Sequence, residues 1–313
     1  MIQYVKNENI DKAQWDACIS NSPNGLVYAY SWYLDIVCPG WCGLVEDTYS
    51  RVMPLPTAEK YGFSYTYPAP HTQQLGLFSP LEITEADVQH FLAHIPALYR
   101  YIEMNLNLNN QLEKGQFKIT KGITHLLDLN GSYKDILAGY SSQTKRNLKK
   151  TRSNSLTILK NAEPQKIIGL FKANRGKEYA QTTSHYSILN TLMNACISKG
   201  YGQSWGVFKE EALCAGAFLL ESNGKTIFLF SGTNHKAYET HAMTFLINQY
   251  LEEHAGQNCI FDFEGSADKD VARFYKGFGS TEKHYLHIRK NTLPLPVKLL
   301  KEIQYRRKSI SYS

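Results

Sequence analysis

The chain has 313 residues, of which 43% are hydrophobic and 20% are charged, and this composition is typical of a globular protein with an ample core. The length predicts two domains, and no apolar run approaches the roughly 20 residues that a membrane-spanning helix needs. The net charge of +6 is too small to indicate a nucleic-acid binder by itself, and the first residues lack a secretory signal pattern. We therefore expect a cytoplasmic protein.

The six cysteines do not form a disulfide framework, because several lie within apolar runs, where Cys behaves as a small buried hydrophobe. Cys38 and Cys42 have the spacing of half a zinc site, but no second pair of Cys or His with zinc spacing follows them. We therefore expect no metal.

The first third of the chain is predicted to alternate short helices and strands with turns. Thr84 precedes a stretch with acidic residues in its first turn, which is typical of a helix N-cap. The segment Lys60–Gln74 is rich in Tyr, Pro and Gly, which favours a long loop of the kind that often binds ligands. The expected elements are helices at Ala13–Ile19, Val27–Val37 and Thr84–Ala97, and strands at Trp41–Val45 and Arg51–Leu55.

The rest of the chain is predicted to be an α/β succession with a mixed sheet. Asn223-Gly224 between two apolar runs indicates a hairpin, and His241–His254 has its apolar residues at helical spacing. The expected strands are Ile119–Leu129, Leu156–Lys160, Gly202–Lys209, Leu213–Glu221, Lys225–Phe230, Cys259–Phe263 and Glu282–Arg289. The expected helices are Ser132–Lys150, with an interruption near Gly139–Ser142, and Gln165–Tyr179, Ile188–Ser198 and Lys269–Tyr275, followed by an appended basic helix after Arg289.

Two motifs resemble those of one family. The stretch Tyr140–Lys150 (YSSQTKRNLKK) and the pair Asp262–Gly265 (DFEG) and Phe274–Gly279 (FYKGFG) resemble the helix and the closing motif of Fem-type aminoacyltransferases and their GNAT-like relatives. The resemblance implies an α/β fold of two tandem GNAT-like domains, each a mixed and mainly antiparallel sheet flanked by helices. It places the domains at 1–130 and 131–290, followed by a basic tail at 291–313.

The same resemblance points to candidate catalytic residues. Acyl transfer to an amine needs a base or amine anchor, a donor to the oxyanion and an acid for the leaving group. Glu264 is expected to face the cleft as anchor or base, because it is the carboxylate closest to the flexible Gly265-Ser266 exit; capping of the next helix is the alternative. Tyr275 is the candidate acid or else a core aromatic. Lys276 is the candidate oxyanion or phosphate ligand or else an exposed helix-end lysine.

Binding residues are expected on other elements. Four cations lie along one broad side of a helix, where like charges are mildly destabilising unless an anion is bound, although a solvated basic face is the alternative. Ser231 and Gly232 follow a strand that supports the resemblance, and His185 and Tyr186 are expected in a polar loop that lines the acceptor pocket. The four cations are Lys145, Arg146, Lys149 and Lys150.

We therefore predict a transferase that moves an acyl or aminoacyl group to an amine of a small molecule or a peptidoglycan-precursor-like acceptor. The donor would be acetyl-CoA, another acyl-CoA or an aminoacyl-tRNA; the stretch Thr233–Ala242 has no glycine for the usual pyrophosphate cradle of CoA enzymes. The alternative is a catalytically silent GNAT-like scaffold that binds an anionic ligand or RNA. A weaker hypothesis gives the tail Lys298–Lys308 a role at a membrane surface.

Overall fold

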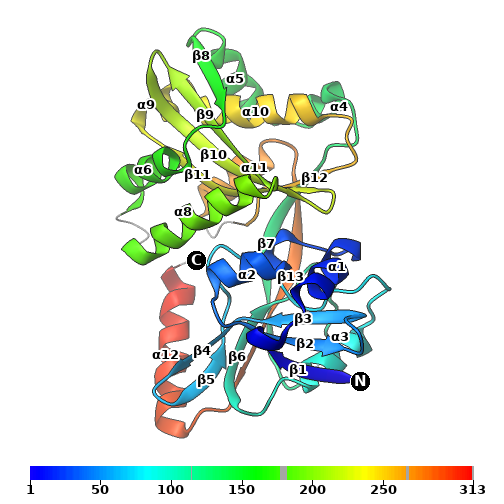
Figure 1. Ribbon diagram of the computed structural model, residues 1–313. Coiled ribbons are helices and arrows are strands. Elements are labelled where there is room, and N and C mark those ends of the chain that lie inside the picture. The colour runs from blue at the N-terminus through cyan, green and yellow to red at the C-terminus, as the bar shows by residue number, and fades with distance from the viewer. Residues whose placement is uncertain (114, 177–181, 266–267, 312–313) are drawn as a thin grey trace. The chain divides into compact units, whose positions relative to one another are not determined.

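The computed structural model describes residues 1–113, 115–176, 182–265 and 268–311 (Figure 1). These residues divide into two compact units, one of Met1–Ile123 with Lys283–Ser313 and the other of Thr124–Glu282. The domain limits at 130 and 290 that the sequence suggests stay a prediction, because the compactness of a unit does not say whether it folds alone.

The N-terminal unit contains a three-stranded antiparallel sheet, β1 (Ile2–Lys6), β2 (Cys42–Glu46) and β3 (Arg51–Leu55). The indole rings of Trp15 and Trp41 pack edge to face, with centroids 4.7 Å apart, and both are fully buried. The short elements before β2 are η1 (Asn7–Asn9), α1 (Lys12–Asn21), η2 (Val27–Ala29) and α2 (Ser31–Val37).

A second set of strands completes this unit, in the order β4-β5-β6-β13. Their bounds are Thr57–Lys60 for β4, Phe63–Thr66 for β5, Tyr99–Asn105 for β6 and Thr281–Asn291 for β13. Helix α3 (Glu85–Ala93) begins at a capping box formed by Thr84 and Asp87, as the sequence predicts for Thr84. Helix α12 (Leu295–Ser311) follows β13.

The C-terminal unit has the strand order β7-β12-β11-β10-β9-β8, and only β11 and β12 pair in parallel. The predicted hairpin at Asn223-Gly224 is confirmed, because both residues have positive φ and join Ser222 to Lys225 as a primed turn requires. The strands are β7 (Lys118–Asp128), β8 (Leu156–Lys160), β9 (Gly202–Lys209), β10 (Ala212–Ser222), β11 (Lys225–Thr233) and β12 (Ile260–Asp262).

Helices cover both faces of this sheet. The core on one face combines Ala215, Ala217 and Leu219 of β10 with side chains of α10, and the intervening Gly216 faces Ile167 of α6 on the other. The helices are α4 (Tyr133–Ala138), α5 (Ser142–Thr151), α6 (Pro164–Asn174), α8 (Thr183–Ser198), α9 (His235–Thr240), α10 (Ala242–His254) and α11 (Lys269–Lys276).

Some sequence expectations were wrong. The segment Lys60–Gln74 is not one long loop, because β5 forms a hairpin with β4 through Tyr61 and Gly62, both with positive φ. Helix α8 begins at Thr183 rather than at residue 188. The end of the helix predicted at Gln165–Tyr179 lies outside the described residues, as does Ser266 in the predicted acidic exit.

Candidate functional site

The parallel strands β11 and β12 diverge after three residue pairs. Ile227 opposite Asp262 is the last pair, after which β11 continues to Thr233. The chain beyond β12 loses its pairing with β11 but continues to pair with β7: the amide of Phe263 donates to the carbonyl of His125 at 2.9 Å, and the amide of His125 donates to the carbonyl of Glu264 at 3.2 Å. Side chains from four elements therefore meet where the two strands separate.

Aromatic rings fill this divergence. The ring of Tyr275 on α11 lies 5.0 Å from that of Phe263 and 6.2 Å from that of Phe228, measured between centroids. Tyr275 is half-buried and packs against the core of the unit. Tyr275 therefore packs as a core aromatic does and also lies at the point where β11 and β12 diverge.

The two carboxylates at this point have different environments. Asp262 is 5% exposed, and its Oδ1 accepts the hydroxyl of Thr124 at 2.5 Å and the amide of Glu264 at 2.8 Å. Burial raises the pKa of Asp262, against the opposing effects of these two hydrogen bonds and of the charge on Lys225. Glu264 is more exposed and has a φ of 58°, a left-handed conformation that is costly for any residue with a Cβ.

A histidine that the sequence analysis did not select lies beside these residues. His125 on β7 is fully buried, its ring centroid is 6.0 Å from that of Tyr275, and neither ring nitrogen has a hydrogen-bond partner among the described residues. Burial lowers the pKa of His125, although the nearby backbone carbonyl of Glu264 acts in the opposite direction. A neutral imidazole offers one nitrogen as a proton acceptor.

Lys276 ends α11 and points to a different partner. Its ammonium lies 2.7 Å from Oε2 of Glu282, and about half of its side chain is exposed. The structure therefore places Lys276 next to Tyr275 in sequence but in a surface ion pair.

The two motifs behind the family resemblance contact each other. The amide of Ser141, the N-cap of α5, donates to the carbonyl of Gly277 at 2.9 Å. The rings of Tyr140 and Phe278 pack edge to face with centroids 5.2 Å apart. A Cβ on Gly279 would lie 3.0 Å from the carbonyl oxygen of Gly139, so the backbones approach too closely for larger residues.

The basic side of α5 is exposed, as are all four of its cations, Lys145, Arg146, Lys149 and Lys150. Lys145 donates to the carbonyl of Ala138 at 2.9 Å, and Arg146 donates to the side chain of Gln143 at 2.7 Å. None of the four forms an ion pair with a carboxylate in the part of the chain that the structure describes. These charges are therefore available to an external anion.

Ser231 and Gly232 lie in the part of β11 that has left β12. A Cβ on Gly232 would lie 2.3 Å from the carbonyl oxygen of Ile167 and 2.9 Å from the amide nitrogen of Phe171, both in the backbone of α6. The absence of a side chain at Gly232 therefore lets α6 pack directly on the strand. Ser231 pairs with Ala217 of β10 in the adjacent register position.

His185 and Tyr186 lie in the first turn of α8 rather than in a loop. Tyr186 is buried, and the ammonium of Lys172 lies 5.1 Å from the centre of its ring. Its hydroxyl has no hydrogen-bond partner among the described residues. Burial lowers the pKa of His185. Phe171 links the group to β11, since its ring centroid is 6.4 Å from that of Tyr186 and 5.0 Å from that of Phe230.

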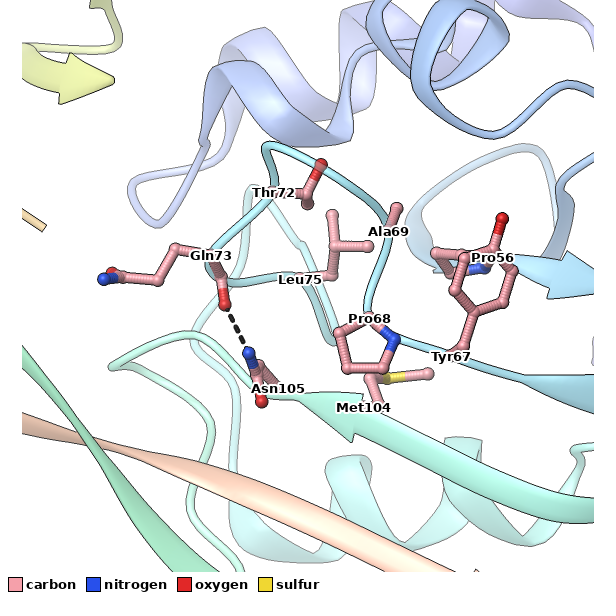
Figure 2. A pocket seen from close by; sticks show the side chains of 9 residues that line it. All are labelled: Pro56, Tyr67, Pro68, Ala69, Thr72, Gln73, Leu75, Met104 and Asn105. Atoms are coloured by element: carbon pink, nitrogen blue, oxygen red, sulfur yellow. Dashed lines mark hydrogen bonds between the residues drawn. The ribbon is translucent and has the colours of Figure 1, made fainter. Parts of the chain in front are cut away.

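The N-terminal unit has a small hollow beside β6 (Figure 2). The side-chain amide of Asn105 donates to the carbonyl of Gln73 at 2.8 Å and fixes the loop that forms one wall. The hollow has a volume of only about 10 Å³, which is room for about one water molecule and far below the range typical of small-molecule sites. It is lined by Pro56, Tyr67, Pro68, Ala69, Thr72, Gln73, Leu75, Met104 and Asn105.

No helix in the described ranges combines the length and the apolar character needed to cross a bilayer. No three His, Cys, Asp or Glu side chains in those ranges gather as potential metal ligands.

The fold is shared with solved proteins at low sequence identity. FemX superposes with a TM-score of 0.67 at 13% identity, over 95% of this chain and 99% of that one. L-PGS from Bacillus licheniformis superposes with a TM-score of 0.55 at 8% identity, over 97% of this chain and 98% of that one. A tandem GNAT protein from the clavulanic acid biosynthesis pathway superposes with a TM-score of 0.54 at 12% identity, over 94% of this chain and 99% of that one. No protein-family model and no curated protein matches the sequence. The likeness establishes the fold alone: the chain has a tandem GNAT-like fold of the Fem type.

Proposed function

We propose that this protein transfers an acyl or aminoacyl group to an amine, with the reaction at the divergence of β11 and β12. The observation that carries the proposal is the meeting of Tyr275, Glu264 and His125 at that divergence, where the imidazole of His125 has no hydrogen-bond partner among the described residues. The fold shared with FemX and a tandem GNAT protein supports the same class of chemistry. The acceptor would be a small molecule or a cell-envelope precursor.

The reaction would proceed by direct attack of the amine on the donor carbonyl. A C–N bond forms, the C–S bond of a thioester or the C–O bond of an aminoacyl ester breaks, and the amine loses one proton. Glu264 would hold the amine, and His125 or Glu264 would accept its proton. Tyr275 would protonate the leaving thiolate or alkoxide. Lys276 would stabilise negative charge on the donor if it left its ion pair with Glu282.

The phosphates of the donor would lie against the basic side of α5. Its four cations are exposed, and the contacts described above for Lys145 and Arg146 are to uncharged groups. The sequence between β11 and α10 contains no glycine from Thr233 to Ala242, so a cradle of backbone amides of the usual GNAT type is missing. This combination favours a donor bound through side chains, which suits an aminoacyl-tRNA as well as acyl-CoA.

Calorimetric titration with acetyl-CoA at low and moderate salt is the first test. Saturable stoichiometric binding, followed by acyl transfer to amine acceptors, supports a CoA-dependent enzyme. If acetyl-CoA gives no heat, the same acceptors are assayed with charged tRNA. Transfer from neither donor contradicts the proposal.

The residue assignment has its own test. Tyr275→Phe and Glu264→Gln keep the size of each side chain and are expected to lower kcat at least ten-fold, within the usual range for loss of an acid or base. Tyr238→Phe is the matched control, because Tyr238 is 56% exposed on α9, and it should leave kcat unchanged. A loss below a few-fold in both variants refutes these roles.

The exposed cations of α5 also favour the second candidate, a silent scaffold that binds an anionic ligand or RNA. In that case RNA affinity should fall steeply with salt, because each phosphate contact releases counterions. Reversal of charge in Arg146→Glu with Lys150→Glu should abolish binding. Unchanged binding in this double variant excludes the scaffold function.

A further inference from the structure

Helix α12 is attached to its own unit through polar contacts. Glu302 accepts from the buried guanidinium of Arg289 on β13 at 2.7 Å and from the side-chain amide of Asn291 at 2.9 Å. The same guanidinium lies 4.0 Å from the ring centre of Tyr305, and the ammonium of Lys301 lies 4.6 Å from that of Tyr101 on β6. The inner face of α12 is thus charged and aromatic.

Its outer face is aliphatic. Leu295, Leu299 and Ile303 recur every four residues, which places them on one side of the helix, with Leu300 next to them. Their exposed fractions are 73%, 59% and 49%, and that of Leu300 is 62%. Single exposed apolar side chains are ordinary, but four adjacent ones on one helix indicate a surface that meets a partner.

The charge of this helix indicates which partner. Lys298 is exposed beside the leucines. Between Leu295 and Ser311 the sequence has five Lys and Arg against one acidic residue, Glu302, whose charge is paired with Arg289. A helix with an aliphatic face and a surplus of cations fits the boundary between headgroups and acyl chains of an anionic bilayer.

We propose that α12 binds the surface of a membrane that contains acidic phospholipids, with Leu295, Leu299, Leu300 and Ile303 inserted below the headgroups. Helix α12 runs beside the strands of its own unit (Figure 1). The contacts of Glu302 and Tyr305 with Arg289 of β13 hold its opposite face there. The helix therefore presents its aliphatic side outward without having to leave its unit. Membrane binding by α12 requires no transferase activity.

Flotation of the full chain with lipid vesicles tests the proposal. We expect binding to vesicles of phosphatidylcholine that contain about one third phosphatidylglycerol, and at least about ten-fold weaker binding to phosphatidylcholine alone or at high salt. The double variant Leu299→Ser with Ile303→Ser should reduce binding at least about ten-fold, because it removes two inserted side chains. Lys298→Glu should weaken binding to the anionic vesicles.

Leu81→Ser is the matched control, because Leu81 is 64% exposed in the same unit but belongs to the loop before α3 rather than to α12. It should bind vesicles as the unchanged chain does, and circular dichroism should show that every variant is folded. Absence of vesicle binding by the unchanged chain, or binding that survives the double variant, overturns the proposal. The proposal is also overturned if light scattering shows a dimer that the double variant dissociates and the unchanged chain does not bind vesicles. The partner of α12 would then be a second copy of the chain.

Discussion

The packing of α6 on β11 predicts opposite effects of alanine at two glycines. Gly232 lies on the strand under the helix, and a Cβ there would be 2.3 Å from the carbonyl oxygen of Ile167, about 1.1 Å closer than the 3.4 Å at which ordinary contact begins. Gly169 lies inside α6 itself, and a Cβ there would meet nothing within 4 Å.

The free energies follow from these surroundings. In Gly232→Ala the new methyl would press on the carbonyl of Ile167 and the amide of Phe171, two groups whose spacing of four residues pairs them in helical geometry. Because backbone cannot rotate away, overpacking and a weakened helical hydrogen bond should cost about 2–4 kcal/mol. Gly169→Ala should instead stabilise the unit by about 0.5–1 kcal/mol, the preference of a helix interior for alanine.

Urea unfolding of both variants, with hydrogen exchange in α6, measures the effect. Gly232→Ala should lower the unfolding midpoint and reduce the protection of amides between residues 164 and 174, whereas Gly169→Ala should raise the midpoint. A neutral or stabilising Gly232→Ala would refute the close approach of helix and strand. If stability is unchanged but binding of an anionic donor is lost, Gly232 acts as the ligand-binding residue suggested by the sequence.

Three further predictions concern the ionisable groups of the C-terminal unit. His125→Leu should raise the free energy of unfolding by about 1–3 kcal/mol, because it removes two buried nitrogens that have no hydrogen-bond partner in the described ranges. The gain should grow as pH falls below 6.5, because the pKa of His125 is lowered in the folded state and the unfolded chain therefore binds this proton first. Loss of transfer in the same variant would identify His125 as the base. The pKa of Asp262 is raised in the folded state, so the unfolded chain releases this proton first and stability should fall as pH rises from 3.8. Urea unfolding of Asp262→Asn across the same pH range should show that this decline is lost. A pH dependence identical to that of the unchanged chain would contradict the effect of burial. Lys276→Met should change the free energy of unfolding, measured by thermal denaturation, by less than about 1 kcal/mol, because its ion pair with Glu282 is at the surface. A large loss of transfer without loss of stability would show that Lys276 binds the donor.

The regular elements of the C-terminal unit were accessible from the sequence because local chemistry determines them. Asn223-Gly224 supplies two residues that tolerate positive φ, and this fixes the hairpin between β10 and β11. Helix α10 was expected at His241–His254 and spans Ala242–His254, because its apolar residues recur at helical spacing. Ser141 and Gly277, selected from separate motifs, are in direct contact.

Elements that depend on tertiary context were missed. Strand β1 has only five residues (IQYVK), and its pairing with β2 stabilises it more than its own sequence does. Strand β5 was assigned to a loop because Pro and Gly surround it, although Phe63 and Tyr65 favour a strand once β4 and β6 are beside them. His125 carries no sequence signal at all: it is one of ten histidines, and only burial beside Tyr275 distinguishes it.

The acidic strand end shows why side-chain alternation alone is an incomplete guide. Alternation along an unbroken strand would place Asp262 and Glu264 on the same face, yet Asp262 is buried and Glu264 is more exposed, because β12 ends at Asp262 and Glu264 has a left-handed φ of 58°. It gave no role to Asp262, yet this buried carboxylate accepts the amide of Glu264 and so holds the left-handed turn that directs the chain away from β11. The divergence of β11 and β12 therefore depends on both residues. A change at Asp262 should disturb any chemistry at Glu264 even though the structure gives Asp262 only 5% exposure to a substrate.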